Sequence, residues 1–275
     1  MSATAISRDE VYQAARKTLD MAAYAELLEA ITAAIFTKTI GDGDVVVDCG
    51  ANVGRHTIAM ARLVGQNGKV HSFEVSPEVS PVVLPWLKER VAAAGVSDRV
   101  VLHEVAVARA AGSVTFHFTQ GGAYGMSALQ PRRLTEELKK TVRYVPTTVR
   151  AVRLDDEISD LSRLTFMKLD LEGGEFDALV GAKRILARNR PVVVFENGRS
   201  ESAEDYRYSK EDFFGFFASI SYRLYDVFGY PFEAMDWQRG GVPWQCVGLP
   251  SEAPLAQQFM HDIQREQRKA GLIVS

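Results

Sequence analysis

The chain has 275 residues, 47% of them hydrophobic, which suits one large α/β domain with a generous core and argues against a second full domain. Its 32 basic and 35 acidic residues give a net charge of −3, so bulk electrostatics gives no reason to expect nucleic acid as the main substrate. Two cysteines exclude a disulfide framework and a four-cysteine zinc site and fit a reducing compartment, so we expect a cytoplasmic protein. No signal segment opens the chain and no apolar run is long enough to span a bilayer, so neither secretion nor membrane insertion is expected.

Residues 1–40 are predicted to form a helical cap ahead of the first strand. From Arg8 to Phe36, alanines and leucines alternate with charges at helical spacing, which predicts one or two amphipathic helices. The apolar residues that mark this spacing are Tyr24, Leu27, Leu28, Ile31 and Ile35. Helical periodicity reports burial alone, so packing against the sheet edge is favoured over a role in gating a substrate.

From Asp44 onward, short β-branched runs alternate with helical stretches, which predicts a mostly parallel sheet flanked by helices. The predicted strands are Val45–Cys49, Lys69–Glu74, Val100–Val105, Thr165–Asp170 and Pro191–Glu196, with an additional strand at Val114–Phe118. Two further strands are expected at Ser221–Val227 and Gln245–Leu249, followed by a helix at Pro254–Lys269. The fold class is therefore α/β, with residues 41–275 forming the main domain.

Residues 119–141 interrupt this rhythm with a polar, glycine-bearing stretch. Long loops in compact domains are often functional, so this one is a candidate for the side of the active site that holds a substrate. Within it, Tyr124, Met126 and Ser127 are the candidate substrate contacts, because the neighbouring glycines allow the loop to close.

The predicted first strand ends in Asp48 and turns through Gly50, Asn52 and Gly54 into a helix, and such turns let backbone amides approach a ligand. The glycine spacing does not match the G-x-G-x-x-G pattern of dinucleotide sites. It suits S-adenosylmethionine, whose ammonium and carboxylate need an acidic residue and backbone donors. At the end of the next strand, Glu74 can take both hydroxyls of a ribose.

These blocks resemble the FkbM family of methyltransferases. The resemblance rests on Val47-Asp48-Cys49-Gly50-Ala51-Asn52-Val53-Gly54, Phe73-Glu74-Val75-Ser76-Pro77, Ala106, and Lys168-Leu169-Asp170-Leu171-Glu172-Gly173 with Glu175. It implies a class I, Rossmann-like methyltransferase domain over residues 41–275, S-adenosylmethionine as donor, and a hydroxyl acceptor on a sugar or natural product. Cys49 and Val75 depart from the usual pattern without removing a polar cofactor contact. The candidate cofactor-binding residues are Asp48, Gly50, Asn52, Gly54, Thr57, Glu74, Val75, Glu104, Ala106 and Asp170.

Carboxylates cluster where the fourth predicted strand ends, the edge at which open α/β sheets bind ligands. The resemblance places Asp170 and Glu172 beside the methyl donor and acceptor, so both are candidate catalytic residues, with Asp170 preferred as the base that deprotonates a hydroxyl. Glu175 is more simply explained as an acidic residue in a first helical turn. Glu196 and Asn197, at the end of the next strand, are further candidates for contact with the acceptor.

A metal-assisted alternative uses the same strand ends. Asp170, Glu196 and Asn197 could supply three oxygen ligands to Mg²⁺, an arrangement similar to that of cation-dependent catechol O-methyltransferases. We do not favour a metal, because oxygen ligands are common at strand ends and the FkbM resemblance does not require one. The simpler explanation of Glu196 is pairing with an arginine such as Arg199.

Two other functions compete with a methyltransferase that acts on a small hydroxylated molecule. A nicotinamide-dependent oxidoreductase is favoured by Glu74 but disfavoured by the glycine spacing and by the lack of a Tyr-x-x-x-Lys pair. A non-catalytic protein that binds S-adenosylmethionine would keep the glycine turn without the chemistry.

Overall fold

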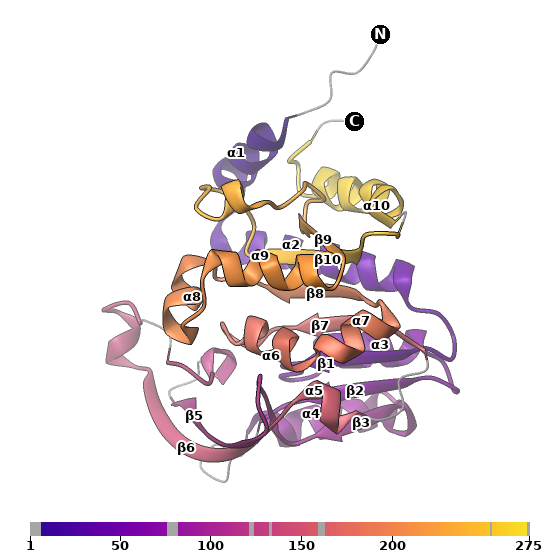
Figure 1. Ribbon diagram of the computed structural model, residues 1–275, viewed down its shortest axis with the longest axis vertical. Helices are drawn as coiled ribbons and strands as arrows, with labels where there is room; N and C mark the ends of the chain where they lie inside the picture. Colours follow the sequence, from indigo (N-terminus) through magenta and orange to yellow (C-terminus); the bar gives the residue numbers. More distant parts are fainter. Residues whose placement is uncertain are drawn as a thin grey trace.

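The computed structural model describes residues 7–75, 82–120, 124–131, 134–158, 163–253 and 255–273. Its centre is a seven-stranded sheet in the order β3-β2-β1-β7-β8-β10-β9 (Figure 1). The strands are β1 (Val45–Cys49), β2 (Lys69–Phe73), β3 (Val100–His103), β7 (Leu164–Leu169), β8 (Val192–Glu196), β9 (Tyr222–Asp226) and β10 (Gln245–Pro250). In this sheet β10 runs antiparallel to β8 and β9, and the other neighbouring strands pair in parallel. This arrangement confirms the predicted Rossmann-like class I methyltransferase fold.

Helices cover both faces of the sheet. On one face lie α2 (Met21–Thr39), α3 (Arg55–Leu63) and α4 (Val83–Ala93). On the other lie α6 (Glu175–Gly181), α7 (Lys183–Asn189) and α9 (Lys210–Ser219), which Figure 1 shows in front of the strands. The sheet is built outward from β1 to β3 on one side and from β7 onward on the other, so the strand order reverses between β1 and β7. Open α/β sheets bind their ligands at such a point.

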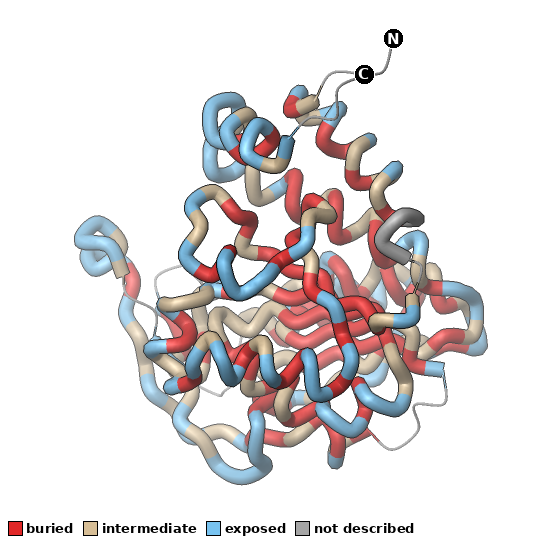
Figure 2. The backbone as a smooth tube through the Cα atoms, turned by 45° about the horizontal axis from the view of Figure 1, so that its top comes forward, coloured by how far each residue is buried: buried red, intermediate tan, exposed pale blue. Residues whose placement is uncertain are grey.

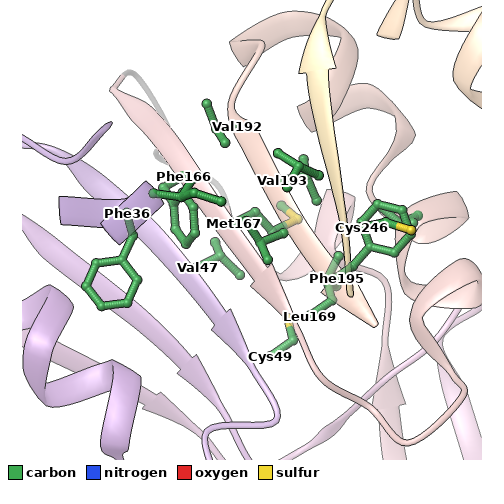
Figure 3. Close-up of a cluster of buried hydrophobic side chains, with 14 of the residues drawn as sticks. Phe36, Val47, Cys49, Phe166, Met167, Leu169, Val192, Val193, Phe195 and Cys246 are labelled. Atoms are coloured by element: carbon green, nitrogen blue, oxygen red, sulfur yellow. The ribbon is translucent and has the colours of Figure 1, made fainter. Parts of the chain in front are cut away.

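The core consists of the apolar side chains of the central strands and the helices that pack on them (Figure 2). Val47, Phe166 and Met167 are fully buried, as expected for strands covered on both faces. Figure 3 shows this cluster continuing across β8 to Cys246 of β10, while Phe36 of α2 joins it from the helical layer. Both cysteines are buried and unpaired.

The predicted N-terminal helices form as α1 (Arg8–Thr18) and α2. Ser7 and Glu10 make a capping box at the start of α1, and the Asp20 side chain accepts a hydrogen bond from Ala23 N at the start of α2, which separates the two helices. The second helix packs on the sheet and on α10 (Leu255–Lys269), so α2 belongs to the core rather than to a detached lid. No described helix is both long and apolar enough to cross a membrane.

A second sheet frames the predicted loop at residues 119–141, most of which connects two of its strands. The additional strand is longer than expected, as β5 (Gly112–Gln120), and pairs antiparallel with β6 (Arg143–Val152), which the sequence did not predict. Pro146 and the mostly exposed face of β6 hid the strand, because a proline within a run argues against a strand. The strand β6 also pairs in parallel with β4 (Ala106–Val107), and this pairing holds the hairpin beside the main sheet (Figure 1).

The remaining elements connect these layers. They are α5 (Leu154–Glu157), α8 (Ser200–Tyr206) and the short 3₁₀ helices at Ser97–Arg99, Tyr124–Met126, Leu138–Lys140 and Ala234–Asp236. Of the motif and loop residues named above, Ser76, Pro77, residues 121–123 and residues 132–133 lie outside the described residues, as does Pro254 at the expected start of α10.

Candidate active site

The turn from β1 into α3 has a backbone that only glycine fits. Gly50 has a φ of +79°, and a Cβ atom built there would lie 1.8 Å from the carbonyl oxygen of Asp170. Gly54 has a φ of +83° and precedes the first residue of α3. The main chains of β1 and β7 therefore approach closely just where the glycine turn begins.

Asp48 lies buried beneath this turn. Its Oδ2 accepts a hydrogen bond of 2.6 Å from Thr57 Oγ1, and Thr57 also contacts Ser72 Oγ at 2.7 Å. Its Oδ1 is buried and has no hydrogen-bond partner in the described part of the chain. A buried oxygen without a partner is costly, so this atom fits the positively charged end of a ligand bound above the turn. Thr57 itself is fully buried, so its role is to hold Asp48.

Glu74 closes the other side of the turn. Its Oε2 accepts a 2.6 Å hydrogen bond from Asn52 N, and its Oε1 accepts one of 3.1 Å from Val75 N. Burial, together with nearby Asp48 and Asp170, raises the pKa of Glu74 to about 7 although both backbone hydrogen bonds lower it. The carboxyl group is therefore held over the glycine turn, as a ribose contact requires.

A cavity of about 130 Å³ opens at this turn, and we call it the inner pocket. Its lining is drawn from β1, β2, β4, β5, β7 and the loops after them, and consists of Gly50, Asn52, Phe73, Glu74, Val75, Val83, Val105, Ala106, Val107, Phe116, Gly125, Ser127, Leu129, Asp170, Leu171 and Glu172. Six candidate cofactor residues are among them: Gly50, Asn52, Glu74, Val75, Ala106 and Asp170. The hairpin residues Phe116 and Leu129 were not predicted, because β6 and the fold of the hairpin were not recognised.

Glu104 and the candidate substrate contacts of the loop are not placed as expected. Glu104 is exposed and pairs with Lys88 at 2.7 Å on the surface, because β3 ends at His103 and the next side chain turns outward. Ser127, expected to contact the acceptor, lines the inner pocket instead, and its Oγ accepts a hydrogen bond from Thr119 N. Met126 is half-buried and lines neither pocket described here, and the side chain of Tyr124 lies outside the described residues.

Lys168 supplies a buried positive charge at the end of β7. Its Nζ lies 2.9 Å from Oδ2 of Asp170, and the lysine is 3% exposed. Burial alone would lower the pKa of Lys168, but Asp170 and Asp48 outweigh it and raise the pKa above its usual value. One oxygen of Asp170 is therefore already paired inside the protein.

The turn after β7 is held by Glu175 from the first residue of α6. Its Oε1 accepts hydrogen bonds from Leu171 N at 2.7 Å and Gly173 N at 3.2 Å. Burial raises the pKa of Glu175 to about 7 against the effect of these hydrogen bonds. The simple explanation of Glu175 as an acidic residue of a first helical turn thus gains a specific role, which is to shape the segment that carries Asp170 and Glu172.

A larger cavity of about 720 Å³, the outer pocket, adjoins the inner pocket and shares Glu172 with it. Its lining comes from the ends of α1 and β8, from α8 and from the loop before β10, and consists of Arg16, Met21, Glu172, Gly173, Glu175, Glu196, Asn197, Gly198, Arg199, Ser200, Glu201, Ser202, Trp237, Gln238, Arg239, Gly240, Gly241 and Trp244. The sequence predicted Glu196 as a contact of the acceptor. It did not predict the loop at residues 237–241, because nothing local in that sequence indicates a pocket.

Asn197 faces inward. Its Oδ1 accepts a hydrogen bond of 2.9 Å from Arg199 N, and its Nδ2 lies 3.9 Å from Cys246 Sγ. The amide therefore orders the segment after β8 and is not turned toward Asp170 and Glu196. Among the described residues no group of three histidine, cysteine, aspartate or glutamate side chains is arranged to hold a metal ion.

Two further side chains near the site have partners within the protein. His56, at the start of α3, binds the carboxylate of Glu29 in α2. Although burial opposes it, this hydrogen bond and the nearby Lys168 lower the pKa of Glu29 to about 2. Arg199 donates to Val242 O at 3.2 Å, so the pairing of Glu196 with Arg199 that the sequence offered is not formed.

The sheet order and the glycine turn at the strand reversal define a class I methyltransferase. The chain belongs to the FkbM family of S-adenosylmethionine-dependent methyltransferases, since residues 48–224 match the family described as the methyltransferase FkbM domain. No curated protein matches the sequence.

Solved structures with a similar fold share little sequence. The FkbM methyltransferase from Methylobacillus flagellatus KT is 15% identical, with a TM-score of 0.46 over 88% of this chain and 58% of its own. TomG from Streptomyces achromogenes, an O-methyltransferase of tomaymycin synthesis solved with S-adenosylmethionine, is 13% identical, with a TM-score of 0.44 over 88% of each chain. An rRNA methylase from Streptococcus thermophilus is 14% identical, with a TM-score of 0.40 over 80% of this chain and 93% of its own. This chain thus spans little more than half of the first of these proteins.

Proposed function

We propose that the protein transfers a methyl group from S-adenosylmethionine to a hydroxyl oxygen of a small molecule, a sugar or a natural product. The observation that carries this proposal is the junction of the two pockets at Glu172, beside Asp170 at the end of β7. A ligand that fills the inner pocket from the glycine turn to Asp170 presents its far end to the outer pocket. Methyl transfer needs such an alignment of donor and acceptor.

The inner pocket suits the donor at three points. The unpaired Oδ1 of Asp48 and the turn at Gly50 fit the amino-acid end of S-adenosylmethionine, and Glu74 fits the ribose hydroxyls. Phe73, Val83 and Phe116 give apolar surfaces for an adenine ring. When bound, S-adenosylmethionine supplies an electrophilic methyl group on a positively charged sulfur, and the carboxylate of Asp170 at the junction favours that charge.

The outer pocket suits a hydroxylated ring. Trp237 and Trp244 offer flat apolar faces, while Glu172, Glu196 and Arg199 offer hydrogen-bonding groups around them. A pocket with few apolar walls and many polar groups favours an acceptor that is itself polar. Together with the net charge of −3, this supports a small-molecule acceptor rather than nucleic acid.

Tritiated methyl transfer to a library of sugars, phenols and hydroxylated natural products tests the proposal, with calorimetry of S-adenosylmethionine binding beside it. We expect binding of the donor and incorporation of label into at least one hydroxylated acceptor. Tight donor binding without any labelled product would favour the non-catalytic alternative. Fluorescence-detected binding of NADH, with none of S-adenosylmethionine, would instead favour an oxidoreductase.

A further inference from the structure

Glu196 differs from the other carboxyl groups at this edge of the sheet. It ends β8 and lines the outer pocket, and Leu169 of β7 pairs with Phe195, so the residues that follow them, Asp170 and Glu196, are neighbours at the strand ends. In the described part of the chain, no hydrogen bond or ion pair engages the Glu196 carboxyl. Three other carboxyl groups near the inner pocket, those of Asp170, Glu175 and Glu74, already have partners.

Those other groups have structural partners. Asp170 is paired with Lys168, Glu175 holds two backbone amides of the turn after β7, and Glu74 holds the amides of Asn52 and Val75. A carboxylate that is already bound by a cation or by amides is a poor choice for taking up a proton in each turnover. Glu196 keeps both oxygens available to a molecule in the outer pocket.

We propose that Glu196 is the catalytic residue that accepts the proton of the acceptor hydroxyl. This inference rests on the proposed function. As the hydroxyl oxygen bonds to the methyl carbon, the methyl–sulfur bond breaks, its electron pair stays on sulfur, and the hydroxyl proton moves to a carboxylate oxygen of Glu196. The products are a methyl ether and a neutral thioether, and Glu196 then releases the proton to water through the open outer pocket.

The surroundings of Glu196 suit this role. Burial raises its pKa well above the usual value, and Asp170, Glu175 and Glu172 raise it further, while Lys168 opposes them. A more basic carboxylate is better matched to a hydroxyl than an ordinary one. The segment that follows Glu196, from Asn197 to Ser202, lines the same pocket, so Glu196 lies at an open cavity and not beneath a covering loop.

Glu196→Gln and Glu196→Asp test the proposal, with Glu89→Gln, which removes an exposed charge on α4, as the matched control. The acceptor is the best substrate from the tritiated-methyl screen. We expect Glu196→Gln to lower kcat by about 10²- to 10⁴-fold, Glu196→Asp to restore part of it, and Glu89→Gln to match the wild type. Among acceptors of one scaffold, the loss should shrink as the hydroxyl becomes more acidic, because such a hydroxyl needs less help from a base.

Binding measurements separate a base from a structural role. Calorimetry should give Glu196→Gln an affinity for S-adenosylmethionine within about threefold of the wild type, and an unchanged affinity for the acceptor in the presence of S-adenosylhomocysteine. Near-normal kcat in Glu196→Gln, or a loss of kcat that only follows weakened binding, would overturn the proposal. If Glu196→Gln kept a near-normal kcat while Asp170→Asn bound the donor but was inactive, the base would be Asp170 and not Glu196. Donor binding without transfer to any acceptor would instead refute the proposed function, and this inference with it.

Discussion

Lys168 and Asp170 form an ion pair, with 2.9 Å between Nζ and Oδ2, at the place where β7 enters the inner pocket. The lysine side chain is almost fully buried, and the nearby carboxylates of Asp48 and Glu29 also interact electrostatically with its ammonium group. One buried ammonium thus balances carboxylates from β1, β7 and α2. Burying either charge alone would be costly, and in this structure each is the partner of the other.

Replacing Lys168 by methionine should lower the free energy of unfolding by about 3–5 kcal/mol, because the remaining carboxylates would be buried without their counter-charge. Chemical denaturation measures this. The control is Lys139→Met, which removes an exposed lysine paired with Glu136 and should cost about 0.3–0.5 kcal/mol. Equal losses in the two variants would show that Lys168 is not the charge that holds this region together.

Replacing Gly50 by alanine tests the close approach at the glycine turn, and Gly95, which lies outside this turn, provides the control. Both have positive φ, +79° and +66°, but a Cβ atom at Gly50 would meet Asp170 O, whereas at Gly95 nothing lies within 4 Å. Gly95→Ala should therefore cost about 1–2 kcal/mol from backbone conformation alone. Gly50→Ala should cost a further ~1–3 kcal/mol and abolish donor binding in calorimetry, because β1 and β7 must move apart. Similar stabilities and intact binding in both variants would contradict the close approach.

Glu74→Gln should weaken S-adenosylmethionine binding by roughly 1.5–3 kcal/mol, the contribution of a charge-assisted hydrogen bond. The pH dependence gives the sharper test. Because the pKa of Glu74 in the free protein is about 7 and a ribose contact favours the ionised carboxylate, wild-type affinity should fall as pH decreases from 8 to 6, by up to about tenfold per unit below pH 7.

The Glu74→Gln variant lacks this titrating group, so its affinity measured by calorimetry should change less over the same range. The variant also corrects for titration of the ligand itself. If the affinity for S-adenosylmethionine changed with pH in the same way in both proteins, Glu74 would not be the residue that contacts the ribose.

Treatment with EDTA should leave methyl transfer unchanged, and added Mg²⁺ should not raise the rate. Asn197, one of the three candidate metal ligands, uses its amide to order the segment after β8 and does not turn toward Asp170 and Glu196 to complete the set. A rate that falls with EDTA and returns with Mg²⁺ would revive the catechol type of mechanism.

The sequence by itself determined the central part of the fold and indicated six of the residues that line the inner pocket. Short β-branched runs, the glycine turn after Asp48 and the acidic strand ends at Glu74 and Asp170 are local signals, since each depends on a few consecutive residues. Those residues meet because the carboxyl ends of parallel strands share one edge of the sheet. Glu104, which directly follows β3, was wrongly included, since its side chain is exposed and pairs with Lys88.

Only the tertiary structure decided what surrounds that edge. The sequence of β6 is rich in β-branched residues, but Pro146 argues against a strand, and only the pairing with β5 fixes it as one. The outer pocket brings Arg16 of α1 to the Trp237–Gly241 loop, and more than two hundred residues separate these parts of the chain. The availability of Glu196 likewise follows from which neighbours are already paired, Asp170 with Lys168 and Asn197 with the backbone of Arg199. Long-range packing sets such contacts, and no pattern in nearby residues encodes them.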